Sequence, residues 1–234
     1  MPYRSAQTLS YLAIGGLGVM GISRLFSAVL GLAQVIAPDQ SLDLGAGEES
    51  PVWLIAQGLI ALVLLPAYIF TIVVFLMWLF RVYKNLEPLG AGSVEMTPGW
   101  AVGWWFIPLA NLIKPFQAVR DAWLESDPDV DESMAMFSKV KGGAPLYMAF
   151  WWGLWIFSNI FSNITNGLVS TAGDTAFDGY IFIIEGLLWT ITSLLAIFVV
   201  RDITERQELR SARRGEVRPT GPPSPPRFDQ DDQP

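Results

Sequence analysis

The chain has 234 residues, of which 52% are hydrophobic and only 16% are charged. A soluble domain usually carries about 25% charged residues, so this composition predicts a protein that exposes much of its surface to lipid. The chain contains neither cysteine nor histidine, which excludes disulfides, thiolate metal sites and histidine-ligated haem. A net charge of −7 argues against nucleic acid as a main partner, and we expect no metal and no cofactor.

Four long apolar segments follow one another, at residues 8–37, 52–80, 145–170 and 179–200. Each is long enough to cross the hydrocarbon core, which requires about 20 apolar residues in a helix. Such segments must be helical in lipid because unpaired backbone groups are too costly there. We therefore predict an all-α, polytopic membrane protein with four transmembrane helices in two hairpins. Glycines in the first segment, at Gly15, Gly16 and Gly18, would allow close helix packing.

The loops between these segments differ in charge. Residues 39–50 carry four acidic side chains and residues 172–178 carry two, and neither loop has a lysine or arginine. Apart from Arg24, every basic residue lies at the opposite ends of the segments. The positive-inside rule then places both termini and the long middle loop in the cytoplasm.

One further apolar stretch, within residues 97–126, does not match a simple crossing. Its uncharged core, residues 98–113, has 16 residues, which is short for a transmembrane helix. Its large apolar side chains recur at helical spacing on one face, at Trp105, Leu109, Leu112, Phe116, Val119 and Trp123. Pro108 and Pro115 would kink or break this helix. We predict a Trp-rich helix that is re-entrant or interfacial on the cytoplasmic side, with a fifth, kinked span as the alternative.

Two charged residues interrupt the apolar segments, Arg24 in the first and Glu185 in the fourth. A charge at such depth costs about 3 kcal/mol on insertion scales and usually faces a partner. The predicted topology places both in the outer half of the bilayer, so we expect an intramembrane ion pair between them. In the alternative, Arg24 reaches the outer headgroups while Glu185 is protonated, or each meets another chain.

The third segment carries a stripe of small polar side chains, comprising Ser158, Asn159, Ser162, Asn163 and Asn166. The three asparagines are spaced by four and three residues, so they share a helical face. We expect the stripe to form hydrogen bonds between helices, where each contributes about 0.6 kcal/mol. A hydrophilic vestibule or ligand site that opens outward is the alternative.

Aromatic and basic residues gather at the predicted cytoplasmic interface, where tryptophan rings prefer to lie. We expect these side chains to contact lipid or a partner protein: Arg81, Lys84, Trp100, Trp104, Trp105, Asn111, Trp123, Trp151 and Trp152. Arg81 and Lys84 would bind anionic lipid headgroups or act as a topological anchor. The membrane domain would span residues 1–210, followed by a Pro- and Asp-rich disordered tail at residues 211–234.

Three stretches of the chain form a distinctive set: WLFRVYKNLEPLG from Trp78, TPGWAVGWWFIPLANLIKPFQAVRDAW from Thr97, and VVRDITERQ from Val199. Together they resemble bacterial membrane proteins of the domain-of-unknown-function family 4328, which implies a location in the bacterial inner membrane. The resemblance covers most of the chain, from the second segment to just past the fourth. It supports the architecture and implies no biochemical activity, because the family has none assigned.

The sequence contains no recognisable pairing of nucleophile and base, no metal-ligand cluster and no phosphate-binding loop. We therefore expect a non-catalytic structural or accessory subunit of a larger membrane protein assembly. It would pack through its transmembrane helices and dock through its cytoplasmic tail, with lipid and other integral membrane proteins as partners. The alternative is a small channel or carrier that uses Arg24, Glu185 and the asparagine stripe.

Overall fold

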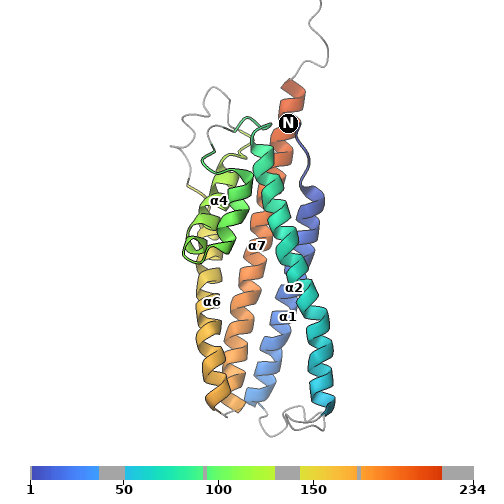
Figure 1. Ribbon diagram of the computed structural model, residues 1–234, viewed down its shortest axis with the longest axis vertical. Helices are drawn as coiled ribbons and strands as arrows, with labels where there is room; N and C mark the ends of the chain where they lie inside the picture. Colours follow the sequence, from blue (N-terminus) through green and yellow to red (C-terminus); the bar gives the residue numbers. More distant parts are fainter. Residues whose placement is uncertain (1, 37–50, 92–93, 130–142, 173–174, 218–234) are drawn as a thin grey trace, which may run out of the picture.

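The computed structural model describes residues 2–36, 51–91, 94–129, 143–172 and 175–217. Four long helices run side by side (Figure 1): α1 (Gln7–Ile36), α2 (Pro51–Leu86), α6 (Leu146–Ala172) and α7 (Thr175–Val217). Between α2 and α6 lie short helical pieces: α3 (Pro98–Gly103), the 3-10 turns η2 (Trp104–Phe106) and η3 (Ala110–Leu112), and α4 (Lys114–Leu124). Every regular element in the described part of the chain is therefore helical, as the sequence predicts.

Within the described residues, α1, α2 and α7 contain stretches long and apolar enough to cross a membrane. The prediction of an all-α membrane protein is thus confirmed. The fourth long helix, α6, has 27 residues and no charged side chain, but it is not one of the three helices that meet this criterion among the described residues. A crossing by α6, and with it the count of four spans, stays a prediction.

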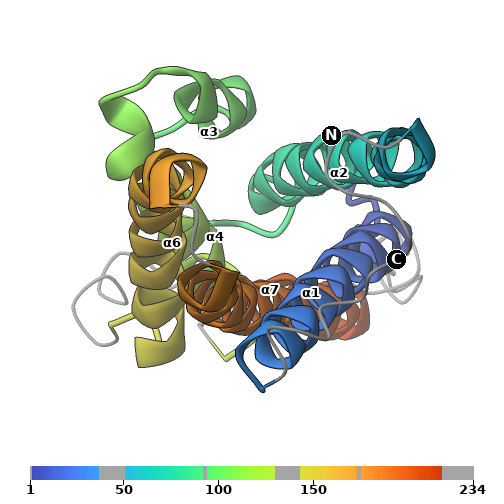
Figure 2. The same ribbon diagram turned by 90° about the horizontal axis from the view of Figure 1, so that it is seen from below.

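The four long helices form a curved row in the order α6, α7, α1, α2 when viewed along their axes (Figure 2). The helices of each predicted hairpin pack together, α1 on α2 and α6 on α7. The most extensive contact, however, joins α1 to α7, the first and last helices of the chain. This leaves α2 and α6 at the two ends of the row.

The contact between α1 and α7 depends on small residues. A Cβ atom added at Gly186 would lie 2.5 Å from the backbone oxygen of Arg24, and one at Gly31 would lie 2.6 Å from that of Gly179. Gly179, Gly186 and Ser193 recur every seven residues, which keeps one small face of α7 against α1. Backbones can approach this closely only where side chains are nearly absent.

The predicted role of the N-terminal glycines in helix packing is confirmed for one of them. Gly16 faces the side chain of Thr71 in α2, whose hydroxyl occupies the place of a Cβ. Gly15 and Gly18 face open space. The prediction for these two is wrong, because they lie on faces of α1 that no described neighbouring helix approaches.

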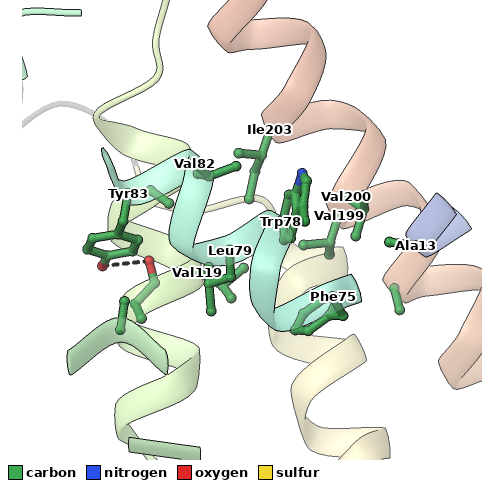
Figure 3. Packing of buried hydrophobic residues seen from close by; sticks show 14 of the residues in the cluster. Ala13, Phe75, Trp78, Leu79, Val82, Tyr83, Val119, Val199, Val200 and Ile203 are labelled. Carbon is green, nitrogen blue, oxygen red and sulfur yellow. Dashed lines mark hydrogen bonds between the residues drawn. The ribbon is translucent and has the colours of Figure 1, made fainter. Parts of the chain in front are cut away.

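The hydrophobic core lies toward one end of the bundle, where the last turns of α2 meet α4, α6 and the middle of α7 (Figure 3). Its entirely buried side chains include Trp78, Leu79, Val82, Val119, Val199, Val200 and Ile203. The hydroxyl of Tyr83 donates a hydrogen bond of 2.9 Å to the backbone oxygen of Ala118, which ties α2 to α4. We refer to this region as the core end of the bundle.

The segment between α2 and α6 is not the single helix that its apolar spacing predicts. The α-helix stops at Gly103 and resumes only at Lys114, because a proline at position 108 cannot supply the backbone N–H that a continuous helix needs. Pro115 starts α4 instead of kinking it, since a proline is tolerated in the first turn. The predicted face is therefore split: Phe116 packs against the core, whereas Leu109 is 83% exposed.

The end of α2 is fixed by a glycine-dependent cap. Gly90 has a φ of +65°, a backbone conformation that residues other than glycine rarely adopt. The N–H of Gly90 bonds to the oxygen of Glu87, and that of Ala91 bonds to the oxygen of Leu86, which is the Schellman arrangement. The chain thereby turns sharply toward α3.

The helix α7 continues to Val217. The predicted disordered tail, residues 211–234, therefore begins too early, because residues 211–217 are helical. The remainder of the predicted tail, residues 218–234, and the acidic loop at residues 39–50 lie outside the described residues.

Candidate functional site

The final turns of α7 carry the most concentrated set of buried polar side chains in the described structure. With 43 residues, α7 is about 65 Å long, well beyond the roughly 30 Å of a hydrocarbon core. The part after Val200 therefore has to extend past the apolar region. We call its polar residues and their partners the polar junction: Asp202, Arg206, Gln207 and Arg210 on α7, with Asn85, Trp123, Ser126 and Asp127.

Gln207 lies at the centre of the polar junction and is fully buried. Its amide nitrogen donates to the backbone oxygen of Val82 at 3.0 Å and to the hydroxyl of Ser126 at 3.1 Å. Its amide oxygen accepts a bond of 3.2 Å from Asn85. One buried amide thus links α2 and the end of α4 to α7, and its polar groups are satisfied inside the protein.

Asn85 extends this network to the N-terminal segment. Its side-chain nitrogen donates to the backbone oxygen of Arg4 at 2.8 Å, and its side-chain oxygen accepts from the Arg4 backbone N–H at 3.3 Å. Nearby, the hydroxyl of Tyr3 donates to Glu208 at 2.9 Å. Burial, and then the hydrogen bond with Glu208, raise the pKa of Tyr3, so the phenol stays protonated and continues to donate.

Asp202 binds two aromatic side chains from two other elements. Its carboxylate accepts a 2.6 Å bond from the indole N–H of Trp123 and a 2.5 Å bond from the hydroxyl of Tyr147. One turn along α7, the guanidinium of Arg206 lies 3.9 Å from the centroid of the Trp123 ring and 3.3 Å from Asp127. The Trp123 ring is thus held at its edge by an anion and at its face by a cation.

Arg210 and Arg214 bind the loops that leave α2 and α4. Arg210, only 5% exposed, donates to the backbone oxygens of Glu125 at 2.5 Å and Gly90 at 3.3 Å. Arg214 donates to the oxygen of Pro88 at 2.7 Å. The charged helix therefore caps carbonyl groups that the ends of α2 and α4 would otherwise leave unpaired.

The three stretches that carry the family resemblance meet at this junction. Trp78 of the first stretch donates its indole N–H to Thr204 of the third at 3.0 Å. The second stretch supplies Trp123, which the third binds through Asp202. The junction is not predicted from the sequence, although Asp202, Arg206 and Arg210 recur every four residues and so share a helical face. Only the fold reveals what this face packs against.

Arg24 and Glu185 come from packed helices but do not pair. The guanidinium of Arg24 lies 5.9 Å from the centroid of the Trp189 ring, and Glu185 accepts a hydrogen bond from the hydroxyl of Thr165 on α6. Their ion pair is not among those of the described residues. The expected pair is therefore corrected: α1 presents Arg24 to the exterior, while Glu185 is directed toward α6.

The polar stripe of α6 divides between two faces. Toward α7, Ser158 is buried and the hydroxyl of Ser162 accepts a 3.2 Å bond from the indole N–H of Trp189. Asn159 and Asn163 each donate to the backbone oxygen four residues earlier, at 2.7 Å and 2.8 Å. Asn163 and Asn166 are exposed, so the asparagine face is directed away from this chain's own helices.

The predicted interfacial residues also separate into two groups. Trp151 and Trp152 are 3% and 6% exposed, and Trp105 packs edge-on against Trp152 at 5.7 Å. Trp105 and Trp123 are partly buried and pack against the same core. The expected contact with lipid or a partner is therefore wrong for Trp151 and Trp152, which the protein's own side chains cover. The residues that remain at the surface or its edge are Arg81, Lys84, Trp100, Trp104 and Asn111.

Comparison with known proteins gives one match. The family model of a domain of unknown function, DUF4328, matches residues 47–205. No curated protein and no solved structure matches the chain. The matched range contains α2, the α3–α4 segment, α6 and the first part of α7.

Proposed function

This chain belongs to the DUF4328 family, and we propose that it is a non-catalytic accessory subunit of a larger membrane protein assembly. In this proposal α6 is the fourth transmembrane helix, and both termini lie in the bacterial cytoplasm. At about 40 Å, α6 is long enough to span a bilayer. It also packs along α7, which is itself apolar enough to cross.

The observation that carries the proposal is the exposed asparagine face of α6. Asn163 and Asn166 are exposed on a helix that is otherwise apolar on the same side, with Ile160 and Ile164 more than half exposed. A side-chain amide at such a position gains hydrogen bonds by contact with another helix, which lipid tails cannot supply. We infer that α6 binds a helix of a partner protein through this face.

The polar junction supports a structural role for the cytoplasmic end. Its carboxylate, amide and guanidinium groups bind one another and the backbone, so the geometry serves to hold α7 rigidly against α2 and α4. Among the described residues, no group of acidic side chains could hold a metal ion. A rigid protruding helix suits a docking role, and in this proposal the tail that follows α7 contributes to docking.

The experiment replaces the asparagine pair. The double variant Asn163→Leu/Asn166→Leu, purified in a mild detergent, is expected to lose the membrane protein that co-migrates with the unaltered chain. The matched control Asn163→Gln/Asn166→Gln keeps the amides and should retain it. A partner that stays bound to the leucine variant would show that this face is not the interface.

A small channel or carrier is the second candidate, and one feature favours it. Polar groups between α6 and α7 form a short column, in which Glu185 binds Thr165 and Trp189 binds Ser162. Ion flux in liposomes that is abolished by Glu185→Gln would support this reading over the accessory role. Against it, two well-formed cavities among the described residues lie near the C-terminal part of α2, away from this column.

A further inference from the structure

A groove runs along one face of α2 near its C-terminal end. Two adjoining cavities form it, of about 380 Å³ and about 500 Å³, and both are lined by Phe80. The α2 residues that line them recur at helical spacing from Val73 to Glu87, a length of about 21 Å along the helix. This length is comparable to that of one lipid molecule in a single leaflet, half of a bilayer about 40–45 Å thick with its headgroups.

The cavity nearer the middle of α2 is apolar except at its rim. Its walls are Leu9 from α1, Val102 from α3, and the residues Val73, Leu76, Met77 and Phe80 of α2, with Arg81 at the edge. Such a surface would accept an acyl chain without leaving polar groups unpaired.

The cavity nearer the end of α2 is more polar. Lys84, Tyr83 and Glu87 contribute to it, together with Pro98 and Gly99 from the start of α3. The change from apolar to polar lining along the groove follows the order of tail and headgroup in a phospholipid.

Two cations lie where the two cavities adjoin. Arg81 lines the more apolar cavity and Lys84 the more polar one, and both follow the shared residue Phe80 within about one turn of α2. Neither forms an ion pair or a hydrogen bond with the described residues, and the ammonium of Lys84 lies 5.9 Å from the centroid of the Phe80 ring. Other arginines at this end of the molecule, such as Arg206 and Arg210, are bound by carboxylates or carbonyls. Arg81 and Lys84 are thus available to an anion.

Tryptophans beside the groove fit the same depth in a bilayer. Trp100, 51% exposed, packs against Trp104 with ring centroids 4.7 Å apart, and the ammonium of Lys114 lies 5.9 Å from the centroid of the Trp104 ring. Amphipathic indole rings are enriched at headgroup level. The position of the two cations therefore coincides with the level at which lipid phosphates lie.

We propose that this groove binds one anionic phospholipid, with an acyl chain along Val73, Met77 and Val102 and the phosphate between Arg81 and Lys84. The Glu87 carboxylate at the polar end would then face the headgroup's hydroxyl groups or water. This site does not depend on the accessory role, because it concerns lipid and lies on α2, whereas the proposed partner face lies on α6.

The test measures lipid binding to the full-length, delipidated protein by native mass spectrometry. Dioleoyl phosphatidylglycerol and dioleoyl phosphatidylcholine are titrated separately, since they share acyl chains and differ in net charge. The unaltered chain is expected to bind the anionic lipid at least about tenfold more tightly, and Arg81→Gln/Lys84→Gln should abolish that preference. The control Arg201→Gln/Arg213→Gln removes two exposed cations elsewhere and should preserve it.

Further variants separate the groove from a general charge effect. Val73→Trp fills the apolar cavity and should weaken binding of both lipids while leaving the charges in place. The thermal midpoint of Arg81→Gln/Lys84→Gln should match that of the unaltered chain, because neither side chain forms an internal bond. An equal affinity for the two lipids, a preference that survives in Arg81→Gln/Lys84→Gln, or displacement of the lipid by millimolar inorganic phosphate would overturn the proposal.

Discussion

At the core end of the bundle, Trp78 and Leu79 are completely buried, whereas in the first half of α2 Leu62 and Leu65 are 70% and 59% exposed. The first region is assembled like a soluble domain, with interlocking rings and satisfied buried polar groups. In the second, helices approach closely through small residues, with glycines at the contact of α1 with α7 and Gly16 of α1 against Thr71 of α2. One chain thus uses two means of holding helices together, interlocked large side chains at the core end and close backbone contact elsewhere.

The comparison predicts that the largest losses of stability come from truncation at the core end. Trp78→Ala removes a fully buried ring and its bond to Thr204, and should lower the free energy of unfolding by about 3–5 kcal/mol. Trp100→Ala is the control, since that ring is half exposed. Unfolding in mixed micelles measures both, and equal losses would contradict the assignment of the core.

A smaller but still large effect is expected from the centre of the polar junction. Gln207→Leu removes three buried hydrogen bonds, with Val82, Asn85 and Ser126, and should cost about 2–3 kcal/mol. The control Glu205→Leu alters an exposed residue two positions away on α7 and should cost less than about 0.5 kcal/mol. The same unfolding assay applies, and a neutral Gln207→Leu would mean that water satisfies these groups.

The contact between α1 and α7 tests helix packing that depends on glycines. In Gly186→Ala the added Cβ collides with the backbone of α1, so the helices must separate, at a cost of about 1–3 kcal/mol. Gly18→Ala adds the same methyl group in open space and should be neutral or slightly stabilising in a helix. If both variants unfold alike, α1 and α7 do not pack as described.

The smallest effect concerns Arg24 and Glu185. Because the two side chains use different neighbours, Arg24→Ala and Glu185→Ala should have additive effects on the free energy of unfolding, within about 0.5 kcal/mol. A complete double-mutant cycle provides the measurement. A coupling above 1 kcal/mol would restore the ion pair that the sequence alone suggests.

Sequence patterns are informative about which segments are helices and less so about how they face one another. The apolar segments of α1 and α7, and the break near Pro108, follow from residue type and spacing. The seven-residue repeat of Gly179, Gly186 and Ser193 was present in the sequence but could not be assigned to α1 without the fold. Long-range pairing is the information that local periodicity lacks.

For the candidate site residues, too, the sequence predicts local features and not long-range contacts. Asn163 and Asn166 share a face by spacing alone, as the sequence predicts, but only the structure establishes that this face is exposed. Trp151 and Trp152 were expected at the lipid interface because tryptophan is common there. They are buried because the α3–α4 segment covers them, a contact between segments about 30–50 residues apart in the chain.

The central claim is that this chain functions within a larger membrane assembly, and native mass spectrometry after extraction in several mild detergents tests it most directly. We expect a defined complex in which the chain co-migrates with a different integral membrane protein at fixed stoichiometry. Recovery of the chain alone, as a monomer or a homo-oligomer in every detergent, would contradict the claim and favour the channel or carrier.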